Sequence, residues 1–197
     1  MTENTTPAHF SEITANPAPL GLLGFGMTTV LLNLHNAGCI ELSSMILSMG
    51  IFMGGLAQVV AGIQEWKKNN TFGATAFTAY GMFWLSLVAL IFLPNMSFAP
   101  NMKTSADGMG WYLLLWGVFT FFMFIATLKS NTLLQVIFFT LTILFFLLAA
   151  SEFMESEMLK KIAGYEGIFC GLSAMYGTAA QVINEVHGKI ILPIGAK

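Results

Sequence analysis

Residues 130–151 read SNTLLQVIFFTLTILFFLLAAS and contain no Asp, Glu or Lys. A membrane-spanning helix needs about 20 mainly apolar residues, so this stretch predicts one span. Five further stretches lack these charged residues, at 13–40, 42–64, 69–102, 108–128 and 167–184. Each can hold one span, and none comfortably holds two. The sequence therefore predicts six transmembrane helices, at about residues 18–37, 43–65, 71–93, 109–128, 132–151 and 163–184.

The composition of the chain supports an all-α membrane protein. Of its 197 residues, 56% are hydrophobic and only 9% are charged, whereas soluble domains have about 25% charged residues. The formal net charge is -2 and the lysines form no basic stripe, which excludes a nucleic-acid partner. Neither Cys39 nor Cys170 has a metal or redox spacing, and no nucleophile–base arrangement is present. We therefore expect no enzyme activity, no cofactor and no metal site.

The connections between the expected helices leave no room for a second domain, although those at 94–108 and in the acidic segment 152–161 are longer. We expect a tail at 1–15, a six-helix pore domain at 16–185 and a tail at 186–197. Residues 1–15 have no lysine and no apolar core, so they do not form a signal peptide. An even number of spans puts both tails on one side, with most of the lysines. The positive-inside rule then predicts cytoplasmic termini in the inner (plasma) membrane.

An internal repeat relates the first, third and fifth helices. Each is expected to begin at an asparagine, namely Asn16, Asn70 and Asn131, and asparagine is a preferred N-cap. The second and sixth helices share the pattern Gly-Ile-Phe-X-Gly, at 50–54 and 167–171. The chain then forms three helical hairpins of like orientation around a central pore. The alternative is that asparagine caps and glycines are simply common in membrane helices.

Counting inward from the three asparagines places three large side chains at one depth. Phe25, Tyr80 and Leu141 lie nine or ten residues beyond them, which is ~14–15 Å and about half the hydrocarbon thickness. If the repeats face one axis, these side chains meet in the middle of the membrane and form an apolar neck. The Tyr80 hydroxyl is then available to bond a passing solute. The alternative is that one or more of the three face lipid.

The odd-numbered helices also offer hydroxyl and amide groups to a passage. The candidates are Thr28, Thr29 and Asn33 in the first, Thr75 and Thr78 in the third, and Gln135 and Thr140 in the fifth. Threonines often bond back to their own helix instead. The helix N-termini at Asn16, Asn70 and Asn131 present free N–H groups and positive dipole ends, which attract anions. Such a path suits a small anion that carries a methyl group.

No carboxylate or ammonium group is expected deep in a span. Glu166 is placed at the start of the sixth helix, where the helix dipole favours it. Glu65 at the inner boundary and His35 near the outer end of the first helix are the candidates for proton linkage. The alternatives are a solvated boundary residue at position 65 and an interfacial residue at position 35.

Residues 16–22, NPAPLGL, resemble the signature of the acetate uptake transporter family. The similarity continues in order through GFGMTT at 24–29, NLHN at 33–36, NTFG at 70–73 and LPIG at 192–195. The resemblance implies a six-helix protomer that assembles as a hexamer in the lipid bilayer, with a pathway for acetate in each protomer. It also implies that Phe25, Tyr80 and Leu141 form the neck. The acidic segment 152–161 departs from the family pattern.

We therefore expect transport of small monocarboxylates, chiefly acetate, with succinate as a weaker candidate. An anion channel and a proton-linked permease both fit. Two other functions stay open: a channel for ammonia or a neutral solute, since fungal relatives are tied to ammonium export, and a membrane sensor with a vestigial pore. Competition of labelled acetate with short monocarboxylates or with ammonium distinguishes them.

Overall fold

The computed structural model describes residues 14–97 and 102–195, which fold into helices without a strand. The first span is α1 (Ala18–Asn36). The second span runs through α2 (Ser44–Met49), the π-helical η2 (Gly50–Ala57) and α3 (Gln58–Lys67). The third is α4 (Thr71–Phe92), which continues into the 3-10 turn η3 (Leu93–Asn95). The remaining spans are α5 (Ala106–Thr127), α6 (Thr132–Phe153) and α7 (Glu157–His187).

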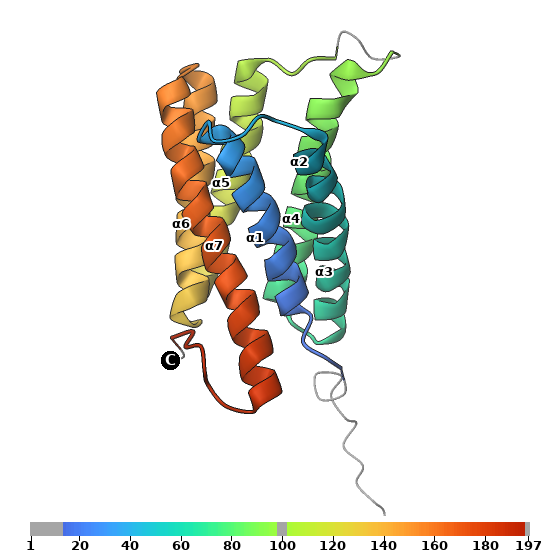
Figure 1. Cartoon of the computed structure of the whole chain (residues 1–197), viewed down its shortest axis with the longest axis vertical. Coiled ribbons are helices and arrows are strands. Elements are labelled where there is room, and N and C mark those ends of the chain that lie inside the picture. Colours follow the sequence, from blue (N-terminus) through green and yellow to red (C-terminus); the bar gives the residue numbers. More distant parts are fainter. Residues whose placement is uncertain (1–13, 98–101, 196–197) are drawn as a thin grey trace, which may run out of the picture.

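Five of these spans are long and apolar enough to cross a membrane by length and composition: the first, the second, the third, α5 and α6. The sixth, α7, has 31 residues but carries charged side chains through its first turns, and it falls outside that group. It nevertheless runs beside α1 and α6 for much of the height of the bundle (Figure 1). The prediction of an all-helical, multi-span protein is confirmed.

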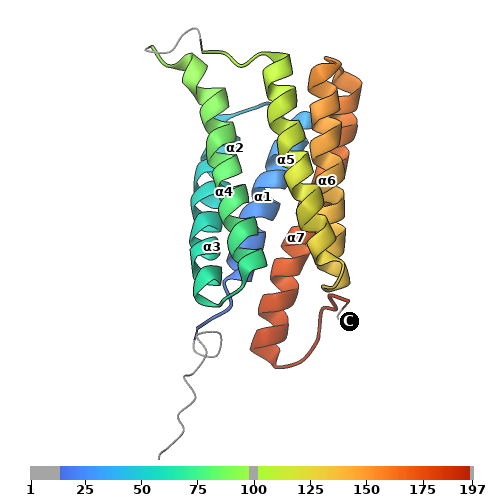
Figure 2. The ribbon, with the colours of Figure 1, turned by 180° about the vertical axis from the view of Figure 1, so that it is seen from behind.

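The spans follow one another around the bundle in the order of the chain. One side of α1 packs along α7 and the other packs against η2 and α3, while α3 packs on α4, α5 on α6 and α6 on α7. The approach of α4 to α5 is the loosest between neighbours (Figure 2). These two helices meet through aromatic side chains, with the rings of Phe83 and Tyr112 stacked at 5.8 Å between centroids. The threefold equivalence of the hairpins stays a prediction.

The start of α1 and the end of α7 lie at one end of the bundle, which we call the inner end (Figure 1). The connection between α1 and α2, the end of η3 and the start of α5 lie at the opposite, outer end. Both ends of the described chain thus share a side, as an even number of spans requires. Residues 1–13 of the expected tail, and Lys197, which supported the predicted sidedness, lie outside the described residues. A cytoplasmic inner end stays a prediction.

Glycines let α1 approach its neighbours closely. A Cβ atom at Gly26 would lie 2.7 Å from the carbonyl oxygen of Gly171 in α7, and one at Gly171 would lie 2.8 Å from the Gly26 carbonyl oxygen. In η2, a Cβ at Gly54 would lie 2.7 Å from Cγ of Trp84. Such approaches exclude a side chain. The glycine patterns of the second and sixth spans therefore mark helix contacts.

Two helices start earlier than the sequence analysis placed them. The start of α5 is three residues earlier, because the Ser105 hydroxyl accepts the N–H of Gly108 at 3.1 Å. The start of α7 is six residues earlier, because the Ser156 hydroxyl accepts the N–H of Leu159 at 3.3 Å. The acidic segment 152–161 is therefore mostly helical, with a short turn between α6 and α7. The predicted spans stopped where charges begin, whereas helices continue past the membrane boundary.

The early start of α7 places Glu166 well inside a helix rather than in its first turn. It lies more than two turns beyond Glu157. Both of its carboxyl oxygens are buried and have no hydrogen-bond partner among the described residues. The expected place of Glu166 in the first turn of its helix is therefore wrong, whereas its depth in the membrane stays a prediction.

Residues 188–195 fold back against the inner end of the bundle. The Asn184 side chain accepts the N–H of Leu192 at 2.9 Å, and the N–H of Thr132 donates to the Gly195 carbonyl at 3.0 Å. This segment thereby supplies acceptors to the first turn of α6. Over its described part, the expected C-terminal tail is docked rather than free.

Candidate functional site

A cavity of about 200 Å³ opens at the inner end of the bundle. Its polar lining consists of Glu65, Asn70, Asn131 and Gln181, and its other lining residues are small or apolar. Most of them come from α1, α4 and α6, which are the first, third and fifth spans. Among the described residues, Glu65 is the one that lines this cavity and carries a formal charge. The inner cavity is thus weakly polar, with a single carboxyl group in its wall.

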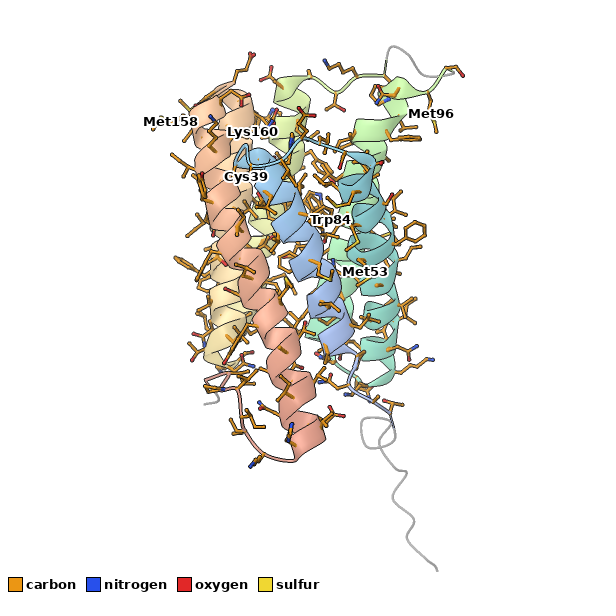
Figure 3. The ribbon with its side chains drawn as sticks, viewed as in Figure 1. Cys39, Met53, Trp84, Met96, Met158 and Lys160 are labelled. Atoms are coloured by element: carbon orange, nitrogen blue, oxygen red, sulfur yellow. The ribbon has the colours of Figure 1, made fainter. Side chains whose placement is uncertain are left out.

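A second cavity, of about 220 Å³, opens toward the outer end. Its polar lining consists of His35, Asn36, Glu152 and Lys160. It adjoins a wider hollow of about 470 Å³ that shares His35, Asn36 and Lys160 with it. The other polar residues that line this hollow are Cys39, Glu41, Glu157 and Lys161, and Figure 3 shows Cys39 and Lys160 at this end. Charges of both signs therefore surround the outer mouth.

Phe25, Tyr80 and Leu141 lie in the bundle interior between these two cavities. None is more than 7% exposed, and the rings of Phe25 and Tyr80 lie 6.2 Å apart between centroids. All three line a small cavity of about 30 Å³ that shares Phe83 with the outer one. The inner cavity ends about one turn before them, at Leu22 of α1. The structure brings the three predicted neck residues together and away from the lipid-facing surface.

The Tyr80 hydroxyl is paired with a side chain of α5. It donates to Oγ1 of Thr120 at 2.9 Å, and the Thr120 hydroxyl donates to the Trp116 carbonyl at 2.7 Å. The tyrosine contributes its ring to the neck while its oxygen bonds α5. The hydrogen bond expected from this hydroxyl to a passing solute stays a prediction.

Four predicted lining threonines do not reach a cavity. The Thr28 hydroxyl donates to the Gly24 carbonyl at 2.6 Å and the Thr140 hydroxyl to the Val136 carbonyl at 2.8 Å, so both bond back to their own helix. Thr75 is exposed on the outside of α4. The Thr78 hydroxyl packs against Gly62 of α3, where it fills the space that a Cβ atom would need, so it faces α3. None of the four lines the cavities described above.

Thr29 and Asn33 do line the small cavity beside the neck. The Asn33 amide donates to the Thr29 carbonyl at 2.9 Å, and its oxygen accepts from Asn36 at 3.0 Å. The Thr29 hydroxyl is buried and has no partner among the described residues. Gln135 instead donates to the Ser130 carbonyl at 2.9 Å, in the inner turn before α6.

The three asparagines of the repeat differ in what they bond. Asn70 and Asn131 cap α4 and α6, as predicted, by accepting backbone N–H groups at 3.0 and 2.9 Å. Asn16 lies one residue before Pro17, the assigned N-cap of α1, and its Oδ1 accepts the N–H of Ala18 at 3.1 Å. Its side chain donates to Gln181 of α7 at 2.9 Å. Two helix N-termini therefore meet the inner cavity through their caps.

Glu65 is buried, at 2% exposure, and one of its oxygens accepts from the Asn70 amide at 2.7 Å. Because Asn70 caps α4, the carboxyl group lies near the positive end of that helix dipole. The solvated position considered for Glu65 is therefore excluded. His35 stands at the outer cavity, where its Nδ1 lies 3.2 Å from the Ile40 carbonyl oxygen.

The sequence analysis missed Trp84, which lines the small cavity with Thr29. Its indole N–H is buried without a partner among the described residues. The polar candidates in the sequence were hydroxyl and amide groups, although tryptophan also has an apolar body with one polar donor. The available signal was its spacing of four residues from Tyr80, which puts both on one helix face.

The sequence profile of the GPR1/FUN34/yaaH family matches residues 2–195. The chain is 55% identical over 183 residues to the succinate-acetate/proton symporter SatP of Escherichia coli (strain K12), which covers 92% of this chain and 95% of the relative. It is 35% identical over 184 residues to ammonia transport outward protein 2 of Saccharomyces cerevisiae (strain ATCC 204508 / S288c), covering 90% of this chain and 65% of the relative.

A solved structure of the bacterial acetate channel SatP has the same fold. It superposes with a TM-score of 0.88 at 54% identity and covers 92% of this chain and 99% of that one. The profile match extends over nearly the whole sequence, including all six spans. This chain is therefore a multi-pass membrane protein of the GPR1/FUN34/yaaH family.

Proposed function

We propose that the protein moves short monocarboxylates, acetate first among them, across the membrane through a pathway inside each protomer. The observation that carries the proposal is the succession of inner, small and outer cavities, with Phe25, Tyr80 and Leu141 as the neck between them. A hydrophobic constriction resists wetting and stops conduction without being closed. A solute with one carboxylate and one methyl group crosses such a neck more easily than a multiply charged solute.

The polar lining supports an anionic solute. The caps of α4 and α6 present helix N-termini at the inner cavity, where backbone dipoles favour negative charge. Relatives named for acetate at more than half identity support the same substrate. Succinate is the weaker candidate, because its second charge must also cross the neck.

We place Glu65 and His35 in the roles that a proton-linked permease requires. Glu65 is the charged group of the inner cavity and His35 lines the outer one. A proton-linked permease needs a group that can exchange a proton beside the substrate, and the Glu65 carboxyl group lines the inner cavity. An anion channel needs no such exchange, and the two mechanisms differ in their response to a pH gradient.

Uptake of labelled acetate into proteoliposomes tests the proposed function. We expect uptake that saturates, that excess propionate blocks and that excess ammonium chloride leaves unchanged. Imposing a pH gradient at a fixed acetic acid concentration separates the proton-linked permease from the channel. The yeast relative named for ammonia supports a competing function, an ammonia channel, and block by ammonium but not by propionate would establish it. Absence of any flux above that of empty liposomes would favour a sensor.

We further propose a homohexamer in the inner membrane with both termini in the cytoplasm. Large apolar side chains cover the outside of the bundle, among them Phe52, Leu115 and Phe122, at 62%, 66% and 63% exposure, as contact with lipid or other protomers requires. The protein mass of the particle in detergent tests the assembly. A mass equal to one or two chains contradicts it.

A further inference from the structure

Two hydrogen-bond donors are left without partners beside the neck. The Thr29 hydroxyl and the Trp84 indole N–H are buried, in residues only 3% and 4% exposed, and neither has a partner among the described residues. Both residues line the small cavity. Buried donors are nearly always paired, and leaving one unpaired costs about 1–3 kcal/mol. Their coincidence in one cavity indicates a place for an acceptor.

The backbone puts the two donors one turn outside the neck. Thr29 follows Phe25 by four residues in α1, and Trp84 follows Tyr80 by four residues in α4, so each shares a helix face with a neck residue. A Cβ at Gly50 would lie 3.5 Å from Cε3 of Trp84. A Cβ at Gly54 would lie 2.7 Å from Cγ and 2.9 Å from Cδ2 of the same side chain. The Cγ–Cδ2–Cε3 edge of the indole therefore packs against η2, and the opposite edge carries the N–H. Figure 3 shows Trp84 inside the bundle, between α1 and the second span.

The rest of the cavity wall offers nothing that competes for the ligand. Its other lining residues are apolar except Tyr80 and Asn33, whose polar groups bond Thr120, Asn36 and the Thr29 carbonyl. No lining residue carries a formal charge. The cavity of about 30 Å³ has room for about two water-sized atoms, since one such atom needs about 10–15 Å³. Two carboxylate oxygens match that space.

We propose that Thr29 Oγ1–H and Trp84 Nε1–H form a two-donor site for the carboxylate of a short monocarboxylate on the outer side of the neck. The methyl group then points back between Phe25 and Leu141. An indole N–H donates and cannot accept, so the site does not hold an ammonium ion through Trp84. The inference rests on the proposed function and adds the residues that recognise the substrate.

The test compares substitutions that remove one donor each and preserve shape. Thr29→Val replaces the hydroxyl by a methyl group, and Trp84→Phe removes the N–H. A hydrogen bond to a charged group is strong enough that we expect each to raise the KM for acetate uptake by about tenfold, with the maximal rate within about twofold of the parent. Thr29→Ser keeps the hydroxyl and should restore the parent KM.

Matched controls lie outside the pathway. The buried Thr142 donates to the Phe138 carbonyl at 2.7 Å and lines none of the cavities described, so Thr142→Val should keep the parent KM. Trp111 is 59% exposed on α5, so Trp111→Phe should do the same. The detergent-solubilised parent provides a measurement without transport. We expect sodium acetate, but not ammonium chloride, to change its tryptophan fluorescence, and this change to be absent in Trp84→Phe.

Unchanged KM values in Thr29→Val and Trp84→Phe, in a parent that transports acetate, would overturn the site and leave the proposed function intact. A lower maximal rate at the parent KM would also overturn it, because the two residues would then shape the neck without binding. If a variant does not assemble, the parent fluorescence decides: no response to acetate refutes the site. A parent without acetate flux refutes the proposed function instead.

Discussion

Leu141→Ala is the most direct perturbation of the neck. Leu141 is 3% exposed and faces the small cavity together with Phe25 and Tyr80. Alanine lacks three of its carbon groups. At about 0.8 kcal/mol of burial free energy each, the substitution removes about 2.4 kcal/mol of apolar contact at the neck. If half of this, about 1.2 kcal/mol, lowers the barrier for the bulkier solute only, the ratio of succinate to acetate uptake rises about eightfold.

The assay is uptake of both labelled substrates into proteoliposomes, each at a concentration well below its KM, with the same reconstituted sample. The control is Ile137→Ala, one turn away on α6. Ile137 is 2% exposed, loses as many carbon groups and lines none of the cavities described. Both substitutions should destabilise the protein by about 2–5 kcal/mol, but only the first should change the ratio.

The reasoning fails if assembled Leu141→Ala protein keeps the parent ratio of succinate to acetate uptake. It also fails if Ile137→Ala raises the ratio equally, because general loosening of α6 would then explain the change.

Three further substitutions test other parts of the pathway. Tyr80→Phe should leave acetate KM and rate near the parent values while lowering stability by about 1 kcal/mol, because the hydroxyl bonds Thr120; a large rise in KM contradicts this placement. Glu65→Gln should bring the ratio of acetate uptake with and without an inward proton gradient toward one, since it removes the carboxyl group of the inner cavity; an unchanged ratio rules Glu65 out. Asn131→Ala should cost about 1 kcal/mol of stability through the lost cap on the Leu134 N–H, measured as a lower midpoint of thermal unfolding in detergent.

The sequence predicted the spans well because hydrophobic length is a strong local signal. Absence of charge over 20 or so residues leaves few alternatives to a membrane helix. It predicted helix ends less well. Ser105 and Ser156 are ordinary N-caps. They lie among charged or polar residues, outside the apolar runs that defined the predicted spans, so they were expected to lie in loops. A search for caps outside the apolar runs finds both.

Counting residues inward from the three asparagines predicted one depth for the three neck residues. It could not predict which polar groups are left without a hydrogen-bond partner. Whether a threonine hydroxyl bonds its own helix depends on its side-chain rotamer and on its neighbours across the bundle. Thr28 and Thr29 are adjacent in sequence, yet the first bonds back at 2.6 Å and the second has no partner. Neither composition nor spacing distinguishes the hydrogen bonding of these two threonines.

Glu65 and Glu166 show the same limit for charges. Both lie beside apolar runs, and the sequence favours the membrane boundary for each. Glu65 is instead buried by the turn into α4, where the Asn70 amide reaches it. Glu166 is carried inward by a helix that begins two turns earlier than its apolar residues indicate. Both outcomes depend on tertiary contacts that no local pattern contains.

Besides Thr29 and Trp84, the Thr78 hydroxyl is a buried donor without a partner among the described residues. So few free donors are consistent with a pathway that releases its solute. The hydroxyls of Thr28, Thr120, Thr127, Thr140 and Thr142 all donate to carbonyls of their own helices. Conduction requires sites that bind firmly enough to admit a solute and weakly enough to release it. Two neutral donors beside the neck meet both conditions. An ammonium group in that cavity would hold a carboxylate far more strongly in such a low-dielectric space, and release would become the slow step.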